Sequence, residues 1–574
     1  MPQDLNDPVW TLIASFLPLA DRFPLLGLCR SVVHSPLRVA YFAETKWHIP
    51  PLDELATRVL DASTMKSYIT TIHIKTAEQL RYLNEFLALE SVSYGEAQGE
   101  QPFPPSLPVD LKRLTLRKVD VPLDELTTLT KLEMLTLNSC SVSSTEESMD
   151  LLSVTELALA HCPDETFEWS SKVPNLRVLR AVGTPVDPGY LTELEHLEEL
   201  HLCDTKIHEL VELTEIGHQL KVLDLKQTPV GDATFDEVDD LFDSLVQVEK
   251  LDLQATAFLG DDLTMLAGLS TLKSLKLSNA VSDLTPLMYL TNLESLSVFT
   301  EPHVDWTPIQ ELKKLRKLDM HQDFNIVNAS ASWTLQQLPL LTTLKLPPQL
   351  SSTQPLLQVR ELEISGLLPQ EILFEVGCCP NVVKLTVTGG FNLASVVASF
   401  SKLTELNLAD FLVYEDFRSL GELKQLETLR LSSCGRKSSY EGFAFLAELT
   451  GLRTLCLDGT VIEDLTVLAG MEHLTNLFLD YTPIDDISVL AELRNLRELS
   501  LRGCSNLANV SSVYGLPSLT TLVIDEHVDC APLVENWSTG SSSLKTVIHE
   551  QDWSCLWTHS ADHPRNGNHT DQVP

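Results

Sequence analysis

Three aspartates occupy equivalent places in three separate stretches of the sequence. Asp283 lies in VSDLTPL, Asp464 in VIEDLTVL and Asp486 in PIDDISVL. A row of carboxylates at regular spacing is one way to hold calcium or another metal ion. These aspartates come only once per stretch, however, without the density of Asp and Gly that a calcium loop requires. We therefore interpret each as the N-cap of a short helix, where a carboxylate accepts hydrogen bonds from free backbone N–H groups, and expect no metal site.

The other residues with catalytic potential form no recognisable set. The 16 histidines are scattered, and a group near the end of the sequence lies in a polar segment: His549, His559, His563 and His569. The phosphate-binding patterns GxxxxGK(S/T) and GxGxxG do not occur, and neither do HExxH or GxSxG. We predict no catalytic residues and no cofactor, so an enzyme is not expected.

A leucine repeat organises most of the chain. The pattern Leu-x-x-Leu-x-Leu recurs, as in LKVLDL (220–225) and LTELNL (403–408). Its first leucine, or a valine in its place, falls at positions 111, 132, 154, 176, 197, 220, 248, 272, 293, 315, 341, 359, 382, 403, 426, 452, 474, 496 and 519. Further copies fit at 69 and 89, and a degenerate last copy fits at 544. Most successive copies are 21 to 23 residues apart. A fixed period of this size predicts a solenoid.

The alternation inside each copy predicts a strand whose leucines point inward and whose intervening residues point outward. No copy can bury its leucines alone, so neighbouring copies must stack. The fold class we predict is an α/β solenoid, a horseshoe with about 19–21 short parallel strands on its concave face, preceded by a small helical N-terminal module.

Small polar residues recur three positions after the last leucine of many copies. They are Cys140, Cys162, Thr184, Thr205, Thr228, Thr256, Cys434, Thr460, Thr482 and Cys504. Thr can hydrogen-bond the loop backbone of an adjacent coil there, and Cys packs as a small, weak donor. This predicts a structural role for four of the eleven cysteines. Ala280 and Phe411 interrupt the series.

The repeat resembles the 22-residue class of bacterial internalins and the phosphatase-regulator type of leucine-rich repeat protein. The stretch at 483–503, PIDDISVLAELRNLRELSLRG, is the most similar, and the resemblance covers roughly residues 65–550. It implies the fold and a protein-binding role, but it does not identify the partner, because this repeat serves many partners.

Charge and cysteine content exclude several classes of function. The formal net charge is −39 at pH 7, which argues against nucleic acid and against anionic membranes as partners. It favours a partner with a basic patch, or it simply keeps a leucine-rich solenoid soluble. No apolar run approaches the ~18 residues of a membrane span. Secreted leucine-rich proteins carry clustered cysteines at their ends; this sequence lacks such clusters and any CxxC pair, so we expect a cytoplasmic protein, with the nucleus as the alternative.

Residues 1–48 do not fit the repeat. Apolar residues at helical spacing, Val9, Leu12, Ile13, Phe16 and Leu17, predict a first amphipathic helix, and two further apolar segments complete a group of three helices. The spacing resembles an F-box, with matches at Leu5, Ile13, Phe16, Leu17, Asp21, Cys29, Arg30 and Trp47 and departures at Asn6, Pro8, Arg22, Pro24 and Val32.

This resemblance implies docking on the Skp-family adaptor of a cullin–RING ubiquitin ligase, through a helix-in-groove contact. The adaptor-binding candidates are Leu5, Ile13, Phe16, Leu17, Leu28 and Cys29. The array would then hold a substrate protein near the ligase. An alternative is that the module only caps the first coil, which would otherwise expose its leucines; one module can do both.

The predicted organisation is therefore a helical module over 1–48, a linker over 49–64, the solenoid over 65–550, and a C-terminal cap remnant with a disordered tail over 551–574. We expect a monomer that binds a protein on its concave face. Two functions remain open: a ubiquitin-ligase substrate receptor, or a scaffold or regulatory subunit of the phosphatase-regulator, cytoskeletal or flagellar type. A secreted receptor is disfavoured by the missing cap disulfides.

Exposed aromatic and arginine residues on the concave face are the best candidates for partner contacts, because these types are enriched at interface hot spots. The candidates are Phe299, His321, Arg430, Phe478, Tyr481 and Arg502, with Phe299, Phe478 and Tyr481 ranked highest. Inserts near 231–245, 322–335 and 435–445 are expected to add binding loops or helices at the rim.

Overall fold

Parallel strands, one per repeat, dominate the computed structural model of this chain. The structure describes residues 47–48, 71–74, 83, 89–95, 101–104, 107–143, 149–163, 169–205, 210–228, 234–256, 262–278, 280–301, 303–322, 329–346, 355–365, 379–388, 400–409, 417–432, 440–513, 515–524 and 546–549. Within these residues, 23 strands form one sheet, and every pairing in it is parallel between neighbours along the chain. The predicted solenoid is confirmed.

The strands of the sheet follow the leucine register. In ladder order they are β1 (Trp47–His48), β2 (Thr71–Ile74), β3 (Ser91–Tyr94), β4 (Arg113–Arg117), β6 (Met134–Asn138), β8 (Glu156–Ala160), β9 (Val178–Val182), β10 (Glu199–Cys203), β11 (Val222–Asp224), β12 (Lys250–Leu253), β13 (Ser274–Leu277), β14 (Ser295–Thr300), β15 (Lys317–Gln322), β16 (Thr343–Leu346), β17 (Glu361–Ser365), β18 (Lys384–Thr388), β19 (Glu405–Ala409), β20 (Thr428–Arg430), β21 (Thr454–Cys456), β22 (Asn476–Phe478), β23 (Glu498–Ser500), β24 (Thr521–Ile524) and β25 (Thr546–His549). All 19 regular copies form a strand, and so do the copies at 69, 89 and 544.

One strand was not expected. β1 lies in the segment that we assigned to the helical module, and it pairs with β2 through Trp47 and Ile72. Among the described residues the sheet therefore begins at Trp47 rather than near residue 65, and its 23 strands include β1 in addition to the copies of the leucine pattern. The Trp47–His48 pair lacks a leucine pattern, which is why the register did not include it.

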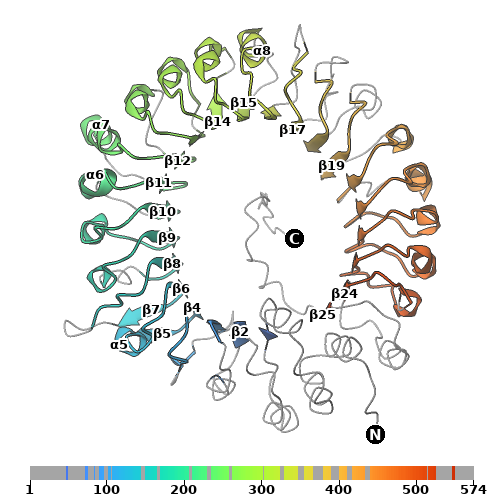
Figure 1. The fold of residues 1–574 in the computed structure, drawn as a ribbon, viewed down its shortest axis with the longest axis horizontal. Helices are drawn as coiled ribbons and strands as arrows, with labels where there is room; N and C mark the ends of the chain where they lie inside the picture. Colours follow the sequence, from blue (N-terminus) through green and yellow to red (C-terminus); the bar gives the residue numbers. More distant parts are fainter. Residues whose placement is uncertain are drawn as a thin grey trace, which may run out of the picture.

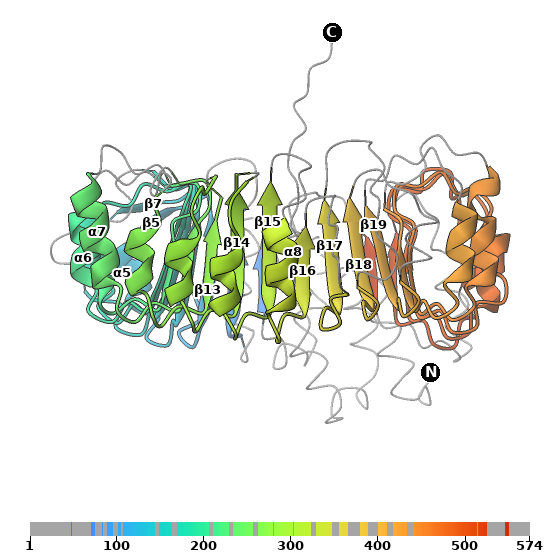
Figure 2. The same ribbon diagram turned by 90° about the horizontal axis from the view of Figure 1, so that it is seen from above.

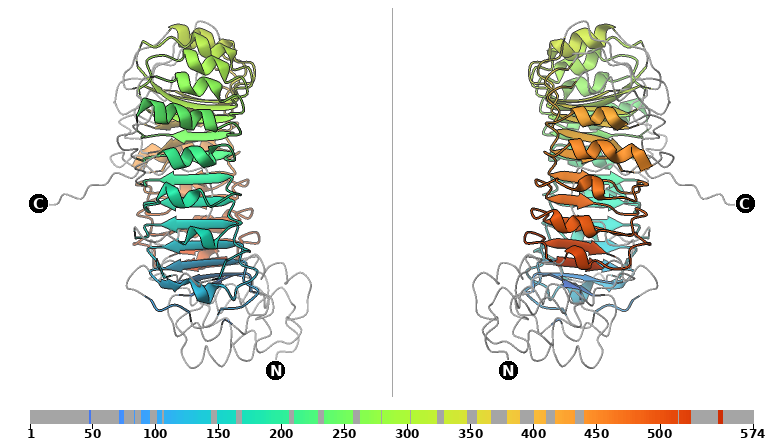
Figure 3. Two further views of the ribbon diagram at one scale, coloured as in Figure 1. Left: turned by 90° about the vertical axis from the view of Figure 1, so that its left-hand side faces the viewer. Right: turned by 90° about the vertical axis from the view of Figure 1, so that its right-hand side faces the viewer.

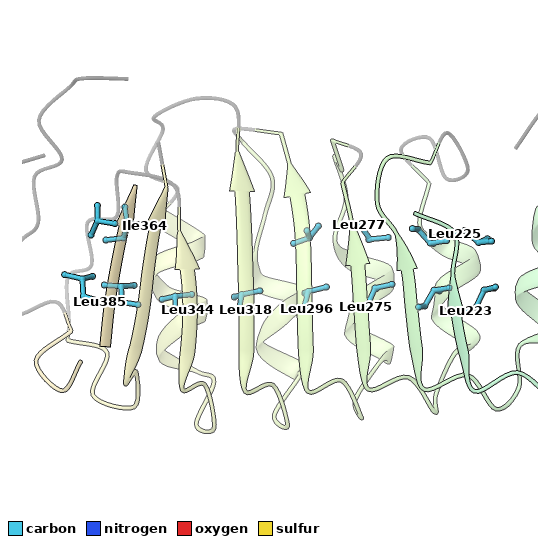
Figure 4. Packing of buried hydrophobic residues seen from close by; sticks show 14 of the residues in the cluster. Leu223, Leu225, Leu275, Leu277, Leu296, Leu318, Leu344, Ile364 and Leu385 are labelled. Carbon is cyan, nitrogen blue, oxygen red and sulfur yellow. The ribbon is translucent and has the colours of Figure 1, made fainter. Parts of the chain in front are cut away.

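The core is a stack of leucine rows. Leu223 of β11 pairs in register with Leu251, then with Leu275, Leu296 and Leu318 on the following strands. All five are at most 1% exposed, and Figure 4 shows these rows lying behind the strands. Burying one leucine side chain contributes about 1.5–3 kcal/mol, and each coil obtains this burial only from its neighbours.

Short helices form the convex side. They are α5 (Leu123–Leu126), η5 (Ser170–Lys172), η6 (Pro188–Leu191), α6 (Val211–Gly217), α7 (Phe235–Ser244), η7 (Thr264–Gly268), η8 (Thr285–Tyr289), η9 (Thr307–Glu311), α8 (Ala329–Gln336), η10 (Phe417–Glu422), η11 (Tyr440–Glu448), η12 (Thr466–Leu468), η13 (Ser488–Glu492) and η14 (Ser511–Val513), where η marks a 3-10 helix. β5 (Asp120–Pro122) and β7 (Ser141–Ser143) form a separate two-stranded sheet. A repeat of about 22 residues leaves room for little more than one helical turn after its strand and turns.

Two of the inserts that we expected at the rim lie on the convex side instead. α7 and α8 fall in the inserts near 231–245 and 322–335, and Figure 2 shows both in line with the other convex helices. The long step from 220 to 248 therefore lengthens the convex segment into a full helix rather than forming a binding loop. Thr234 and Glu237 form a capping box at the start of α7, which fixes where this helix begins.

The repeated aspartates cap the convex helices, as predicted. Each lies one residue before the N-cap position rather than at it. Asp283 Oδ1 accepts the Thr285 N–H at 2.8 Å, Asp464 Oδ1 the Thr466 N–H at 2.8 Å, and Asp486 Oδ1 the Ser488 N–H at 2.7 Å. The same Asp-x-Thr geometry occurs at Asp262 and Asp305. Each carboxylate is thus an Asx turn that begins a helix.

The predicted ladder of Thr and Cys is buried and bonded to the backbone of the coils. Thr460 Oγ1 donates to Leu457 O at 2.7 Å, and Cys504 Sγ donates to Leu479 O, in the preceding coil, at 3.1 Å. Burial raises the pKa of the Cys140 and Cys162 thiols. These cysteines are structural, as expected. Cys434 and Phe411 lie outside the described residues.

The array bends almost into a closed ring. Figure 1 shows the strands lining the inside from β2 round to β24, with the helices outside, and Figure 3 shows the stacked coils from both flanks. The ladder is continuous through the irregular steps between 315 and 382. With 22 gaps of about 4.8 Å, the inner arc is roughly 105 Å, which gives an inner diameter on the order of 33 Å for a full circle.

Candidate functional site

The register places three rows of outward-facing side chains on the inner surface of the ring. In the repeat at 220–226, the first row holds Val222, the central row Asp224 and the third row Lys226, while Leu223 and Leu225 are buried between them. Strand pairing aligns the equivalent residues of the next repeats. We call the three rows on β4–β24 the concave wall.

The central row is continuous from β4 to β24. It reads Thr115, Thr136, Ala158, Arg180, His201, Asp224, Asp252, Lys276, Ser297, Asp319, Lys345, Glu363, Thr386, Asn407, Arg430, Cys456, Phe478, Ser500 and Val523. Most of these side chains are half-buried because each lies between equivalents on two neighbouring strands.

The concave wall is electrically neutral although the chain is strongly acidic. On the described residues of its three rows, eleven cations face eleven anions. The cations are Arg113, Arg117, Arg180, Lys226, Lys250, Lys276, Lys317, Lys345, Lys384, Arg430 and Arg502; the anions are Glu156, Glu199, Asp224, Asp252, Asp319, Glu361, Glu363, Glu405, Asp458, Asp480 and Glu498. The excess acidic residues that give the chain its net charge of −39 therefore lie outside these rows.

Many of these charges are paired across neighbouring strands. The pairs are Arg180 with Glu156 (3.4 Å) and Glu199 (3.7 Å), Lys276 with Asp252 (3.0 Å), Lys345 with Glu363 (2.9 Å) and Lys384 with Glu405 (3.6 Å). Because the side chains already neutralise each other, a partner meets a surface of hydrogen-bonding and apolar groups rather than a strong field.

A histidine and a carboxylate of the central row meet across β10 and β11. His201 Nδ1 lies 3.3 Å from Asp224 Oδ2, and the Lys226 N–H donates to Asp224 Oδ1 at 3.0 Å. Burial by itself would raise the pKa of Asp224, but the bonds from His201 and from the Lys226 N–H outweigh it and hold this pKa below its usual value. Burial raises the pKa of the Cys203 thiol on the same strand, which is opposite to what an activated nucleophile needs.

The predicted contact residues fall into two groups. Phe299 of β14 and His321 of β15 are direct ladder partners in the third row. Arg430 and Phe478 share the central row on β20 and β22, and Arg502 ends the third row after β23. Tyr481 is not on a strand. It lies at the turn after β22 with φ +57° and is 50% exposed at the rim, so its assignment to the concave strands was wrong.

A hydrogen-bonded network connects the repeats of β21, β22 and β23, which carry Phe478 and Arg502. Cys456 Sγ donates to Asp458 Oδ2 at 3.0 Å, and Asp458 Oδ1 accepts the Asp480 N–H at 2.9 Å. Asp480 Oδ1 in turn accepts the Arg502 N–H at 2.9 Å and the Ser500 hydroxyl. Burial, and then the charge of Asp458, raise the pKa of Asp480, although the Ser500 bond opposes them.

Sequence reasoning missed the wall before Leu220. Arg180, His201 and the apolar Val178 and Val182 occupy it, and Val182 is 40% exposed. Extending the same register towards the N-terminal copies would have found them. The adaptor-binding candidates Leu5, Ile13, Phe16, Leu17, Leu28 and Cys29, and the tail after 550, lie outside the described residues.

Over the part of the chain that the structure covers, no group of three or more His, Cys, Asp or Glu side chains is arranged to hold a metal ion. Six cysteines there are free thiols. None of the helices described is long and apolar enough to cross a membrane.

The ladder of single parallel strands with convex helices defines a leucine-rich repeat solenoid. No protein-family model matches the chain, and no curated protein matches its sequence. Solved structures with similar folds include an internalin from Listeria monocytogenes, at 19% identity over 65% of this chain and 82% of that one, with a TM-score of 0.25. A leucine-rich repeat protein of Leptospira interrogans covers 77% of this chain and 90% of its own at 19% identity, with a TM-score of 0.27.

The leucine-rich repeat ectodomain of a plant membrane receptor kinase from Arabidopsis thaliana is also similar. It was solved in complex with Casparian strip integrity factor 2, and it matches 87% of this chain and 77% of its own at 15% identity, with a TM-score of 0.33. At such identities and TM-scores nothing about partners follows, and the fold class rests on the strand ladder itself.

Proposed function

We propose that this chain is a non-catalytic, monomeric receptor or scaffold that binds a partner protein on its concave wall. The observation that carries the proposal is the unbroken central row through β4–β24, which presents a neutral surface with apolar and aromatic side chains. Neutral, partly apolar surfaces can be desolvated by a partner at lower cost than clusters of unpaired charge.

The size of the ring limits what can bind there. A domain of about 100 residues has a radius of gyration of about 13 Å, so its diameter is close to the ring's inner diameter of about 33 Å before side chains are counted. A helix, about 10–12 Å wide, or an extended segment fits easily. We therefore expect a projecting segment or small domain of the partner to enter the ring.

A photo-crosslinking residue tests this proposal. It is placed in the full chain either at Phe478, in the central row, or at Tyr289, which is 58% exposed on η8 of the convex side. Expressed in the source cells, the variant at 478 should crosslink a defined protein and the variant at 289 should not. Equal yields, or crosslinks from 289 alone, would contradict binding on the concave wall.

The finer role that we propose is substrate presentation to a cullin–RING ubiquitin ligase, supported by the F-box-like spacing of residues 1–48. The competing role is a scaffold or regulatory subunit without a ubiquitin function, in which that segment only caps the array. We place either role in the cytoplasm or nucleus, where the free thiols of the described cysteines would be stable.

A matched pair of substitutions separates the two roles in the full chain. Ile13→Asp puts a charge on the predicted apolar helix face, and Thr11→Asp puts the same charge on the opposite face. In a pulldown, the Skp-family adaptor should be recovered with the wild type and with Thr11→Asp, and lost with Ile13→Asp. No recovery with the wild type would reject the ligase role, and equal recovery with both variants would reject the docking face.

A further inference from the structure

One charged residue of the central row has no ion pair or side-chain hydrogen bond within the described part of the chain. The row contains eight charged residues, and seven of them have an ion pair or hydrogen bond: Arg180, Asp224, Asp252, Lys276, Asp319, Lys345 and Glu363. The eighth, Arg430, is half-buried on β20 and makes no side-chain hydrogen bond or ion pair among the residues that the structure describes. Its guanidinium group is therefore available to a ligand.

The neighbours of Arg430 in the central row supply no negative charge. Asn407 lies on one side and Cys456 on the other. Burial and the charge of Asp458 raise the pKa of Cys456 to about 11, so the thiol stays protonated at neutral pH. The carboxylate of the nearby Asp458 already accepts hydrogen bonds from the Cys456 thiol and the Asp480 N–H. A half-buried cation that forms no ion pair with the described residues favours a carboxylate from outside.

An apolar contact lies at a fixed distance from this cation. Phe478 occupies the central row two strands beyond Arg430, with Cys456, only 3% exposed, between them. Two strand spacings separate the two positions by roughly 10 Å. At the rim beside Phe478, Tyr481 exposes half of its surface. The wall therefore offers a cation and then an aromatic surface, in that order along the ladder.

We propose that β20–β22 bind a segment of the partner protein that carries a carboxylate and an apolar side chain about 10 Å apart. The carboxylate pairs with Arg430, and the apolar side chain packs on Phe478. Asp458 and Asp480 of the third row would repel the carboxylate from β21 and β22, which fixes the direction of the segment. In a segment with the polyproline II conformation, which has three residues per turn and rises about 3.1 Å per residue, side chains three positions apart point to the same side and lie about 9 Å apart. This inference rests on the proposed function.

A displayed peptide library tests it with the full chain immobilised. The wild type is compared with Arg430→Met and with Lys424→Met. Lys424 belongs to the same repeat but pairs with Glu448 on the outer side at 2.7 Å, so this control removes an equal charge away from the wall. The wild type and Lys424→Met should enrich peptides with Asp or Glu three positions from an apolar residue. Arg430→Met should bind those peptides roughly ten- to a hundredfold more weakly.

Each other outcome has a distinct meaning. The role of Arg430 would be overturned if the wild type enriched peptides without an acidic residue, or if acidic peptides bound Arg430→Met equally well. The proposed function would still stand in that case, provided that Phe478→Asp abolishes the binding of those peptides. If no peptide is enriched, or if Phe478→Asp leaves binding unchanged, both this inference and the concave wall as the binding surface are contradicted. Unchanged melting temperatures of the variants exclude misfolding as the cause.

Discussion

The ring of Tyr481 lies against the backbone of Gly503: a Cβ atom on Gly503 would come within 2.2 Å of Tyr481 Cδ1. Both residues occupy the turn directly after the third row in successive repeats, and both have positive φ, +57° and +68°. His161 and Gly183 repeat this arrangement, with His161 Nδ1 only 2.5 Å from the corresponding Cβ position. A glycine at this turn therefore accommodates the ring from the preceding coil.

Gly503→Ala should destabilise the chain by about 1–3 kcal/mol, because it combines a strained positive φ with displacement of the tyrosine ring. Thermal unfolding measures the effect. Gly470→Ala is the matched control, since Gly470 has φ +89° and nothing within 4 Å of its Cβ position; it should cost only the backbone strain. Equal losses for the two variants would show that the ring contact is unimportant, and adding Tyr481→Ala to Gly503→Ala should recover part of the loss.

The same turn is left-handed in many repeats without being glycine. Ala255 has φ +55°, and the residues that share its position and conformation are Lys118, Ser139, His161, Asp204, Gln227 and Tyr481. Ala255→Gly should therefore stabilise the chain by up to about 1 kcal/mol, because it removes the Cβ clash of the left-handed region. Ala158→Gly, on β8 in extended conformation, should instead destabilise it by about 0.5–1 kcal/mol. A lower melting temperature for Ala255→Gly would contradict the strain.

The strands could be predicted from the leucine period alone, because burial on one face requires alternation and burial between coils requires a constant repeat length. β1 could not, since Trp47–His48 carries no leucine and its pairing with β2 is a tertiary contact. The left-handed turn was also missed. It is set by the chain leaving the strand, and the side chains at that position range from Gly to Tyr.

The candidate surface was predictable by position but not by pairing. The register placed Phe478 and Arg430 on the wall correctly. It extended the strand alternation too far at Tyr481, where the backbone has already turned. Arg430 is the one charged residue of the central row without a partner among the described residues, and this depends on side-chain geometry across three strands, which periodicity does not contain.

The aspartates that begin the convex helices should make stability depend on pH. The bonds from Thr307 lower the pKa of Asp305, with the side-chain bond the larger cause, and the Thr466 backbone N–H and hydroxyl lower that of Asp464. A carboxyl whose folded pKa is depressed stabilises the fold above its unfolded pKa, near 3.8, and this stabilisation is lost as pH falls through the folded value. The melting temperature should therefore drop below about pH 4.

An Asp305→Asn, Asp464→Asn double variant isolates this effect. The amide oxygen still accepts the N–H but does not titrate, so the variant should lose less stability than the wild type between pH 5 and pH 3, a range that spans the unfolded pKa near 3.8. The alanine pair should be less stable than the wild type at neutral pH as well, because the cap is lost. If the asparagine variant and the wild type lose the same number of degrees, these two carboxylates do not carry the pH dependence.

The location of the acidic charge predicts how partner binding responds to salt. The exposed side of α7 carries Asp236, Asp239, Asp240 and Asp243, whereas the concave wall is neutral. A basic partner drawn to the outer surface would lose affinity steeply as salt screens these charges. A partner on the wall should change its Kd less than about threefold between low and high salt, because only local pairs such as that of Arg430 are screened.

A binding titration decides between the two surfaces. It uses the partner identified by crosslinking, and it compares the wild type with a variant in which these four aspartates are changed to asparagine. Binding on the wall predicts the same Kd for both proteins at each salt concentration. A weaker Kd for the asparagine variant at low salt, converging with the wild type at high salt, would instead place the partner on the convex side.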